Sequence, residues 1–197
     1  MITSLDQLDL NKKYTYADYL TWQITERVEL IKGKIFKMAP APNLYHQQVS
    51  GRLFVALFTQ LNLKKCQVFA APFDVRLHKK EASDKSTETV VQPDICIVCD
   101  KEKLDRKGCN GSPDFIVEIL SLSTSKRDLQ DKKELYAINK IPEYWIIHPT
   151  DGTVIRYLLE KGNKEYVFNG IFTLGDTLEL VSIAGISIEL NKLFFDL

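Results

Sequence analysis

The chain lacks an excess of charge of either sign. Its 197 residues include 26 Lys and Arg and 26 Asp and Glu, for a formal net charge of zero. Proteins that bind nucleic acid tightly without sequence preference are often basic, so this balance counts mildly against that class, although it is compatible with a local basic patch. The sequence also lacks internal repeats, low-complexity segments and linkers, and 45% of its residues are apolar. We therefore expect a folded chain with a full core, organised as one domain over residues 1–197.

Long apolar runs are absent as well. No run approaches the roughly 18 apolar residues that indicate a membrane span. The first residues include Asp6, Asp9, Lys12 and Lys13 in place of the apolar segment of a signal peptide. We predict a cytoplasmic protein that makes no membrane contact.

Cysteine is scarce, and its spacing does not indicate a metal site. The four cysteines are Cys66, Cys96, Cys99 and Cys109. Cys96 and Cys99 form a CxxC pair, yet they belong to a strand-like run in which positions three apart point to opposite faces. They would not easily chelate one ion. We predict buried, reduced thiols, as is typical of a cytoplasmic protein.

The apolar pattern predicts an α/β protein. Residues 14–38 are expected to form a short helix capped by Thr15 and a hairpin that turns at Lys32-Gly33. The core, about residues 45–149, has the order helix, three strands, helix, strand (α-β-β-β-α-β), with predicted ranges 45–61, 68–77, 90–99, 115–120, 125–139 and 144–147. Residues 150–197 form a β-rich extension that begins at an Asp151-Gly152 turn. The result is a mixed β-sheet flanked by helices, with β additions at both ends.

Glu118 is the most informative residue. It lies in a run, 115–120, that otherwise predicts a buried central strand. A carboxylate among apolar neighbours is costly unless a charged group meets it. Two interpretations stay open: a buried ion pair or a raised pKa, or a functional site.

Asp94 opens the strand that precedes this run, 24 positions before Glu118. Strand alternation places it on one face with Cys96 and Val98. Two carboxylates from neighbouring strands make a natural Mg²⁺ site, because Mg²⁺ prefers hard oxygen ligands and few protein ligands. The alternative is that Pro93-Asp94 marks only a turn before the strand.

Lys132 lies near the middle of the apolar arc of the helix that follows Glu118. Leu129, Leu135 and Tyr136 share this arc at about 100° per residue. A lysine centred on a core-facing stripe is unusual. It either pairs with Asp128 one turn earlier, or it reaches the carboxylate site as a cation that orients water or neutralises phosphate charge.

His46 and Glu29 are two further candidates. His46 heads the apolar face of the 45–61 helix, where it is either a packed helix-end histidine or an acid/base or phosphate-contacting group. Glu29, flanked by Val28 and Leu30 in the N-terminal hairpin, either joins the site or pairs at the surface with Arg27 or Lys32.

These residues resemble a known nuclease pattern. Gln92-Pro93-Asp94, followed by Val117-Glu118-Ile119-Leu120, is similar to the PD-(D/E)xK nuclease superfamily. A wider set looks like the Uma-two branch of bacterial restriction endonucleases and matches from about Tyr14 to Pro149. This set comprises 28–33, His46, 113–121, Ser123-Thr124, Asp128-Leu129, Lys132, Tyr136 and 142–145.

The resemblance implies a restriction-endonuclease-like core and a Mg²⁺ or Mn²⁺ ion held by Asp94, Glu118 and the backbone carbonyl of Ile119. It also implies hydrolysis of nucleic-acid phosphodiesters by metal-activated water, with DNA as the expected partner. One position departs from the pattern: the superfamily places a lysine two residues after the acid, where this chain has Leu120. Some members supply the lysine from the following helix, and Lys132 is the candidate by its facing.

Three functions are compatible with the sequence. The first is a Mg²⁺-dependent endonuclease acting on DNA, with Lys126, Arg127, Lys132 and Lys133 near its phosphates. The second is a nucleic-acid-binding or assembly module that keeps the nuclease fold without turnover, which the missing lysine and zero net charge favour. The third is a hydrolase of another phosphoester. Leu193, Phe194 and Phe195 either form the face of a homodimer, which suits cutting both strands of a duplex, or cap the core.

Overall fold

The computed structural model describes residues 1–38, 43–61, 65–78, 82–121 and 127–196. The helices are η1 (Leu5–Gln7), α1 (Tyr16–Tyr19), α2 (Leu44–Leu61), η2 (Lys101–Lys103), η3 (Arg127–Lys132), α3 (Lys133–Ile138) and α4 (Leu190–Leu193). The strands are β1 (Val28–Ile31), β2 (Lys34–Lys37), β3 (Gln67–Ala70), β4 (Val75–Arg76), β5 (Val90–Val91), β6 (Ile95–Val98), β7 (Leu104–Asp105), β8 (Gly108–Asn110), β9 (Phe115–Ile119), β10 (Glu143–His148), β11 (Thr153–Leu158), β12 (Val167–Phe172), β13 (Thr177–Glu179) and β14 (Ser187–Glu189).

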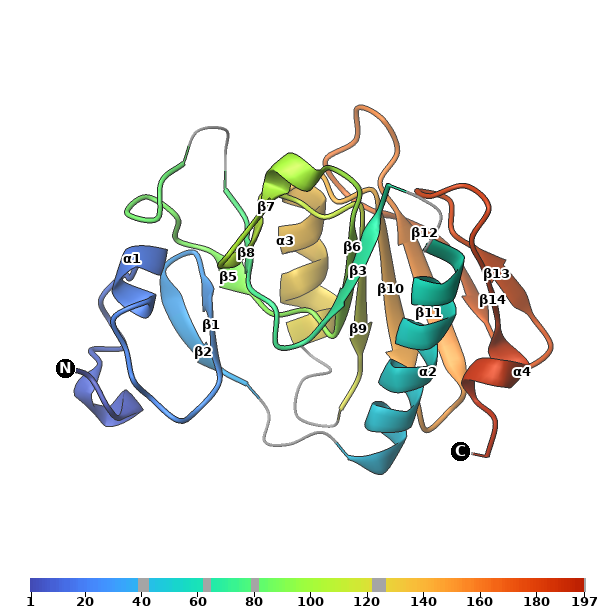
Figure 1. The fold of residues 1–197 in the computed structure, drawn as a ribbon, viewed down its shortest axis with the longest axis horizontal. Helices are drawn as coiled ribbons and strands as arrows, with labels where there is room; N and C mark the ends of the chain where they lie inside the picture. Colours follow the sequence, from blue (N-terminus) through green and yellow to red (C-terminus); the bar gives the residue numbers. More distant parts are fainter. Residues whose placement is uncertain (39–42, 62–64, 79–81, 122–126, 197) are drawn as a thin grey trace.

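The main sheet has the strand order β12-β11-β10-β9-β6-β3, and β10 runs parallel to β9 while the other pairs are antiparallel. Helix α2 covers one face of this sheet and α3 the other (Figure 1). In chain order the central elements are α2, β3, β6, β9, α3 and β10. The predicted α-β-β-β-α-β core with β additions at both ends is therefore confirmed.

Helix α2 packs on the main sheet through one row of apolar side chains. Val49, Leu53, Leu57 and Leu61 recur every four residues and are at most 3% exposed, because this spacing places them on one side of the helix. Phe58, on the opposite side, is 55% exposed. This row fixes α2 against the face that carries Ile95, Val117 and Trp145, among others.

A second six-stranded sheet, of order β2-β1-β5-β4-β8-β7, lies on the far side of α3 from the main sheet (Figure 1). Its hairpin β1–β2 turns at Lys32 and Gly33, whose φ angles are 53° and 79°. Two positive φ angles match the right-handed twist of a two-residue hairpin. The predicted hairpin is confirmed, as is the helix cap, since Thr15 and Asp18 bond reciprocally at the start of α1.

Two predicted strands are wrong in extent. The 68–77 run divides into β3 in the main sheet and β4 in the second sheet, with a cis Ala71–Pro72 bond between them. The 90–99 run likewise divides into β5 in the second sheet and β6 in the main sheet, with Pro93 between them. Proline lacks the N–H of a sheet ladder, so each chain segment leaves one sheet there and enters the other.

The predicted 125–139 helix is confirmed in part. Residues 127–132 form the π-helical turn η3, and α3 continues to Ile138. The predictions for Ser123, Thr124 and Lys126, and for the side chains of Arg127, Asp128 and Leu129, lie outside the described residues.

The prediction of four reduced thiols is wrong for two of them. Cys66 and Cys99 form a disulfide with an S–S distance of 2.05 Å. The cause is register: Gln67 pairs with Val98 across β3 and β6, so Cys66 and Cys99 face each other one position further on. Cys96 and Cys109 are buried free thiols, as predicted. Cys96 and Cys99 pack on opposite faces of the sheet, which confirms that they do not form a common ligand pair.

The C-terminal extension packs onto the main sheet. The buried carboxylate of Glu143 accepts hydrogen bonds from the backbone N–H groups of Val181 and Ser182, at 2.8 and 2.7 Å. Leu193 and Phe194 are buried in the core, whereas Phe195 is 64% exposed. The interpretation that these residues cap the core therefore holds for Leu193 and Phe194, and the homodimer stays a prediction.

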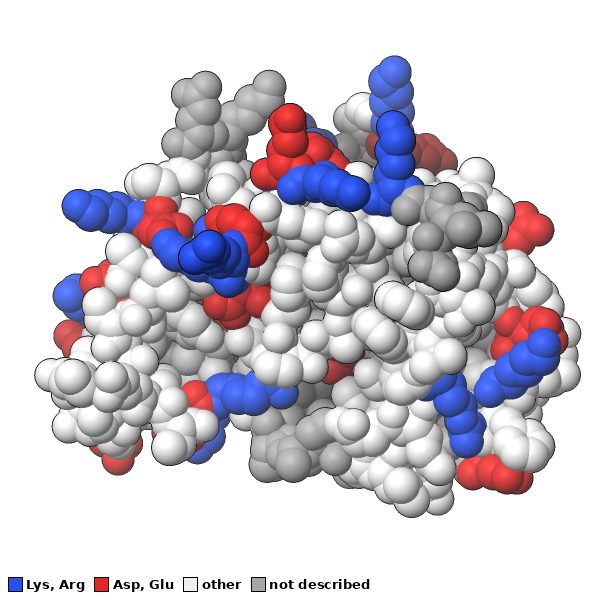
Figure 2. Space-filling view, in the orientation of Figure 1, with Lys and Arg blue, Asp and Glu red and all other residues white. Residues whose placement is uncertain are grey.

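Charged side chains are mixed in sign on the surface. On the face in Figure 2, lysine and arginine alternate with aspartate and glutamate toward the margins, and the middle is mostly uncharged. Among the described residues, no helix is both long and apolar enough to cross a membrane.

Candidate active site

The ends of β6 and β9 bring the two predicted carboxylates together. Ile95 pairs with Val117 in antiparallel register, so the next position outward places Asp94 opposite Glu118. The backbone N–H of Ile119 donates to Asp94 Oδ2 at 2.7 Å. Asp94 therefore faces Glu118 by backbone register and accepts from the Ile119 backbone at the ends of β6 and β9, and the metal-binding role of this set stays a prediction.

Glu118 is met by two donors from the helical segment that follows its strand. Lys132 Nζ lies 2.8 Å from Glu118 Oε1, and the Tyr136 hydroxyl donates to the same oxygen at 2.6 Å. Glu118 is 4% exposed and Lys132 is 3% exposed. Burial, followed by the charge of Glu118, raises the pKa of Tyr136 well above its ordinary value, so this hydroxyl stays a neutral donor.

Glu29, which belongs to the second sheet, contacts the same ammonium group of Lys132. Its Oε1 lies 3.0 Å from Lys132 Nζ and accepts the backbone N–H of Gln92 at 2.9 Å. Glu29 is 1% exposed, so the alternative of a surface pair with Arg27 or Lys32 is wrong. The cause is tertiary: β1 packs against α3, which turns Glu29 inward between the two sheets. Lys132 thus joins carboxylates of both sheets.

His46 contacts the other carboxylate. The residue is 7% exposed on the first turn of α2, and its Nε2 lies 3.2 Å from Asp94 Oδ2. His46 Nδ1 is buried and has no hydrogen-bond partner within the described part of the chain.

The Asp94 side chain lies at the end of β6. Asp94 precedes the first residue of this strand, and its carboxylate contacts His46 of α2. Cys96 and Val98, predicted to share its face, pack with α3. The shared face of Asp94 stays a prediction.

A pocket of about 290 Å³ opens beside Asp94. It is lined by Arg27, His46, Ser50, Ala71 and Asp94, among others. The Asp94 side chain is 21% exposed, against 5% for Glu118. A substrate that enters this pocket therefore meets Asp94 and His46 before it meets the buried Glu118.

The donor set fits a divalent cation of the Mg²⁺ type. Within the described ranges, no three His, Cys, Asp or Glu side chains gather closely enough to form an all-protein metal cage. Mg²⁺ does not need such a cage, because it keeps several waters and usually binds one or two carboxylates. Asp94 and Glu118 supply two carboxylates on adjacent strand ends, and the Ile119 backbone lies beside them.

The lysine position of the pattern is filled by an apolar residue. Leu120 is 5% exposed and packs in the core between the main sheet and α3. The cation next to Glu118 comes from Lys132 instead, at the end of η3. Of the other basic residues expected near phosphates, Lys133 lies over the ring of Tyr157, with its Nζ 5.0 Å from the centroid.

Two contributors to the site received no role from the sequence. Tyr136 shares the helical arc of Lys132, which was the available signal for its contact with Glu118. Gln92 links Glu29 to the neighbouring polar network through its backbone and side chain. Nothing local marks Gln92 for this contact, because its partners are 63 and 18 positions away in sequence.

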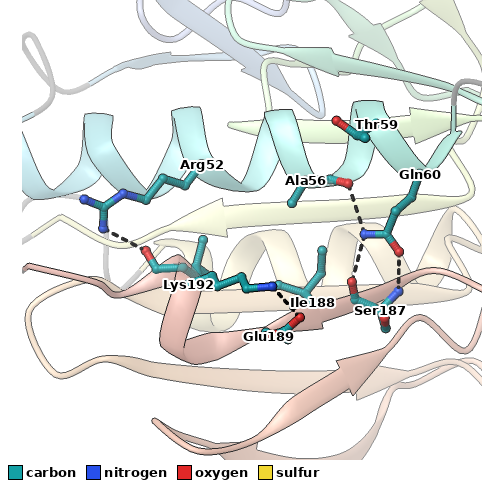
Figure 3. A pocket seen from close by; sticks show the side chains of 9 residues that line it. Arg52, Ala56, Thr59, Gln60, Ser187, Ile188, Glu189 and Lys192 are labelled. Carbon is teal, nitrogen blue, oxygen red and sulfur yellow. Dashed lines mark hydrogen bonds and ion pairs between the residues drawn. The ribbon is translucent and has the colours of Figure 1, made fainter.

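A further hollow of about 280 Å³ separates α2 from the C-terminal extension (Figure 3). Its polar groups already bond to each other: Gln60 and Ser187 exchange two hydrogen bonds, and Arg52 donates to the carbonyl of Leu193. These hydrogen bonds hold α2, the helix that carries His46, against α4 and β14.

The main sheet, with α2 on one face and α3 on the other, is a mixed α/β fold that a solved structure shares. A crystal structure from Anabaena variabilis, described as "a putative nuclease belonging to DUF820", aligns with a TM-score of 0.71. The alignment covers 92% of this chain and 97% of that one, at 18% identity, which shows a shared fold.

The chain belongs to the Uma2 family, described as "Putative restriction endonuclease", whose model matches residues 16–191. The uncharacterized protein slr1290 of Synechocystis is 26% identical over 187 residues, covering 92% of each chain. The resemblance inferred from Asp94, Glu118 and the surrounding motifs is confirmed.

Proposed function

We propose that this protein is a Mg²⁺- or Mn²⁺-dependent endonuclease that hydrolyses phosphodiester bonds of DNA. The observation that carries the proposal is the contact of Lys132 Nζ with Glu118, at 2.8 Å, beside Asp94. It brings two carboxylates and one lysine together, although the lysine of the sequence pattern is replaced by Leu120. Family membership supports the same class of activity.

Asp94, Glu118 and the Ile119 carbonyl would hold the divalent ion. When bound, the ion would polarise the phosphodiester as a Lewis acid and activate the attacking water. Asp94 lines the open pocket, so it is the carboxylate that an entering phosphate group approaches first. The Ile119 N–H fixes the orientation of Asp94 by its 2.7 Å hydrogen bond.

The other residues have positioning and electrostatic roles. Lys132 holds Glu118 and supplies positive charge near the developing negative charge of the phosphoryl group. Glu29 and Tyr136 hold Lys132 and Glu118 in turn, at 3.0 and 2.6 Å. His46 contacts Asp94 through its Nε2, at 3.2 Å, and it also lines the pocket that would admit the phosphate.

A second candidate function is a nucleic-acid-binding or assembly module that keeps the fold without turnover. The observation that favours it is the burial of Lys132 between Glu29 and Glu118, at 3% exposure. A cation held by two carboxylates is well placed to stabilise the fold and less free to act on substrate.

Cleavage of supercoiled plasmid tests the first candidate. We expect the wild type to nick or linearise plasmid with Mg²⁺ or Mn²⁺ and to stop when a chelator is added. Asp94→Asn and Glu118→Gln should lose cleavage while they keep the near-ultraviolet circular dichroism of the wild type. A folded wild type that cleaves no DNA under either metal, yet retards it in a gel, would favour the binding module.

A substrate panel separates DNA hydrolysis from action on other phosphoesters. The wild type should release product from plasmid and from single-stranded DNA, and not from a chromogenic phosphate monoester. Turnover of the monoester alone, lost in Asp94→Asn, would replace the nuclease proposal with a phosphatase.

A further inference from the structure

A second pocket, of about 280 Å³, adjoins the candidate active site on the side of the N-terminal helix. It is lined by Tyr19, Trp22, Arg27, Pro72 and Gln92, among others. The proposed reaction at Asp94 and Glu118 gives it no role. Its walls combine aromatic rings with one guanidinium, one amide and the carboxylate of Glu26. Aromatic rings with a few polar groups are found where proteins bind planar, polar ligands.

The aromatic wall is held in place from behind. The rings of Trp22 and Tyr19 have centroids 5.7 Å apart at an interplanar angle of 59°. Tyr14 packs edge-on against Trp22, with centroids 5.2 Å apart at 82°. Trp22 and Tyr19 are half-buried, and Tyr19 also stacks on Tyr16, with centroids 5.7 Å apart at 22°. Braced aromatic rings of this kind are stacking platforms for nucleobases.

Gln92 fixes the orientation of the polar side chains on the other side of the pocket. Its side-chain carbonyl accepts from Arg27 Nη2 at 2.9 Å and Nε at 3.3 Å, and its amide nitrogen donates to Asp74 at 2.8 Å. A guanidinium has five N–H donors, so Arg27 keeps donors for a ligand while Gln92 fixes its direction. Arg27 is exposed, and its charge is accessible from the pocket.

The two pockets are neighbours, because they share a lining residue and adjoining chain segments. Arg27 lines both of them. Ala71 lines the pocket of Asp94 and the adjacent Pro72 lines the second pocket. Gln92, in the second pocket, precedes Asp94 by two positions. A ligand that spans them needs a planar group at Trp22 and an anionic group at Arg27, within reach of Asp94.

We propose that the second pocket is a base-binding subsite, which receives one unstacked nucleobase of the DNA substrate beside the scissile phosphate. Trp22 and Tyr19 stack on the base, and Arg27 contacts the phosphate that joins it to the reacting position. This inference rests on the proposed nuclease function. The volume suits a single base, so the base must leave its stack, and single-stranded or distorted DNA is the preferred substrate over regular duplex.

The test measures binding separately from cleavage. The full-length protein is titrated, with Ca²⁺ in place of Mg²⁺, with a short single-stranded oligonucleotide and with the same backbone lacking its bases. Tryptophan fluorescence and the anisotropy of a dye on the DNA are read together. Trp145 is 0% exposed, so quenching by a base reports on Trp22.

We expect the intact oligonucleotide to quench fluorescence and the baseless one to bind roughly 5- to 100-fold more weakly without quenching, the range that stacking of one base gives. Trp22→Leu should weaken binding of the intact oligonucleotide by a similar factor, and Trp22→Phe should restore it. Arg27→Ala, at an exposed position, should weaken both ligands. If Trp22→Leu fails to fold, the proposal is still tested by the binding of the intact and the baseless oligonucleotide to the wild type and to Arg27→Ala.

The outcomes also separate this subsite from the proposed function. Equal affinity for both oligonucleotides, no quenching, or no binding of single-stranded DNA would overturn the subsite, even if plasmid is cleaved. Base-dependent binding by a protein that cleaves nothing with Mg²⁺ or Mn²⁺ would keep the subsite and overturn the nuclease. Base-dependent binding together with cleavage supports both.

Discussion

Lys132 Nζ lies 2.8 Å from Glu118 Oε1, and both side chains are at most 5% exposed. The contact joins the last residue of η3 to the next-to-last residue of β9. It has a structural consequence and a chemical one. The buried charges stabilise each other against the loss of hydration, and the lysine stands next to the carboxylate that the family resemblance assigns to the metal.

The structural consequence predicts that Lys132→Met is strongly destabilising. It leaves Glu118 and Glu29 as buried carboxylates without their cation, and breaking a buried pair costs about 3–5 kcal/mol. Urea denaturation measures the loss. Lys192→Met is the matched control, because its pair with Glu189 is largely exposed, and it should change stability by about 1 kcal/mol or less. A small loss in Lys132→Met would contradict the buried network.

A double-variant cycle identifies the cause of that loss. Adding Glu118→Gln to Lys132→Met removes the uncompensated charge, so the double variant should be more stable than the sum of the two single losses predicts. Additive losses would show that Lys132 and Glu118 are not energetically coupled in solution.

Tyr136→Phe isolates the neutral donor of the site. It removes the hydroxyl that donates to Glu118 at 2.6 Å and leaves the buried ring in place. A hydrogen bond to a charged group contributes about 1.5–3 kcal/mol, so we expect a loss of this order in urea denaturation. Tyr157→Phe is the control, since its hydroxyl has no hydrogen bond within the described residues. Equal stability of both variants would remove Tyr136 from the network.

Stability should fall at alkaline pH. Burial raises the pKa of Tyr19 to about 12 from 10.0 and that of Cys109 to about 12 from 9.0, and it raises the pKa values of Tyr136 and Cys96. Folding favours the protonated form of each group, so their contribution is fully present below pH 9 and declines from about pH 9 to 12, as the unfolded chain loses protons first. Free energies of unfolding from urea titrations across this range check the sign. Constant stability up to pH 11 would contradict it.

The disulfide predicts sensitivity to reductant. Cys66 and Cys99 are 33 positions apart, and a cross-link of a loop this long stabilises by about 3–4 kcal/mol. A thiol assay in denaturant should find two free thiols per chain, from Cys96 and Cys109. A reducing agent should lower the melting temperature of the wild type and leave a Cys66→Ser/Cys99→Ser variant unchanged. Four free thiols in the purified protein would contradict the pairing.

Local periodicity in the sequence predicts part of the fold and part of the candidate site. The facing of Lys132 on its helix and the isolation of Glu118 in an apolar strand made their contact one of two alternatives, beside a pair of Lys132 with Asp128. The order of the central elements was predictable for the same reason. The nuclease resemblance then assigned roles that neither periodicity nor spacing supplies.

The parts that the sequence did not predict depend on non-local contacts. Glu29 reaches Lys132 only because the chain crosses twice between two sheets, near Pro72 and Pro93, and so places β1 over α3. Apolar residues on both sides of Pro72 and of Pro93 gave each segment the pattern of one strand, which concealed both crossings. The Cys66–Cys99 pair likewise follows from the register of β3 on β6, which no single segment specifies.

The most direct test of the central claim moves the lysine back to its usual place. Leu120 lies two positions after Glu118 in the core that α3 covers, so Leu120→Lys brings an ammonium toward the same carboxylate. Mg²⁺-dependent plasmid cleavage is measured for the wild type, Lys132→Met and Leu120→Lys/Lys132→Met, each verified as folded. We predict that Lys132→Met loses cleavage and that the double variant regains a measurable part of it. Full cleavage by folded Lys132→Met would contradict the assignment of Lys132 as the lysine of this site.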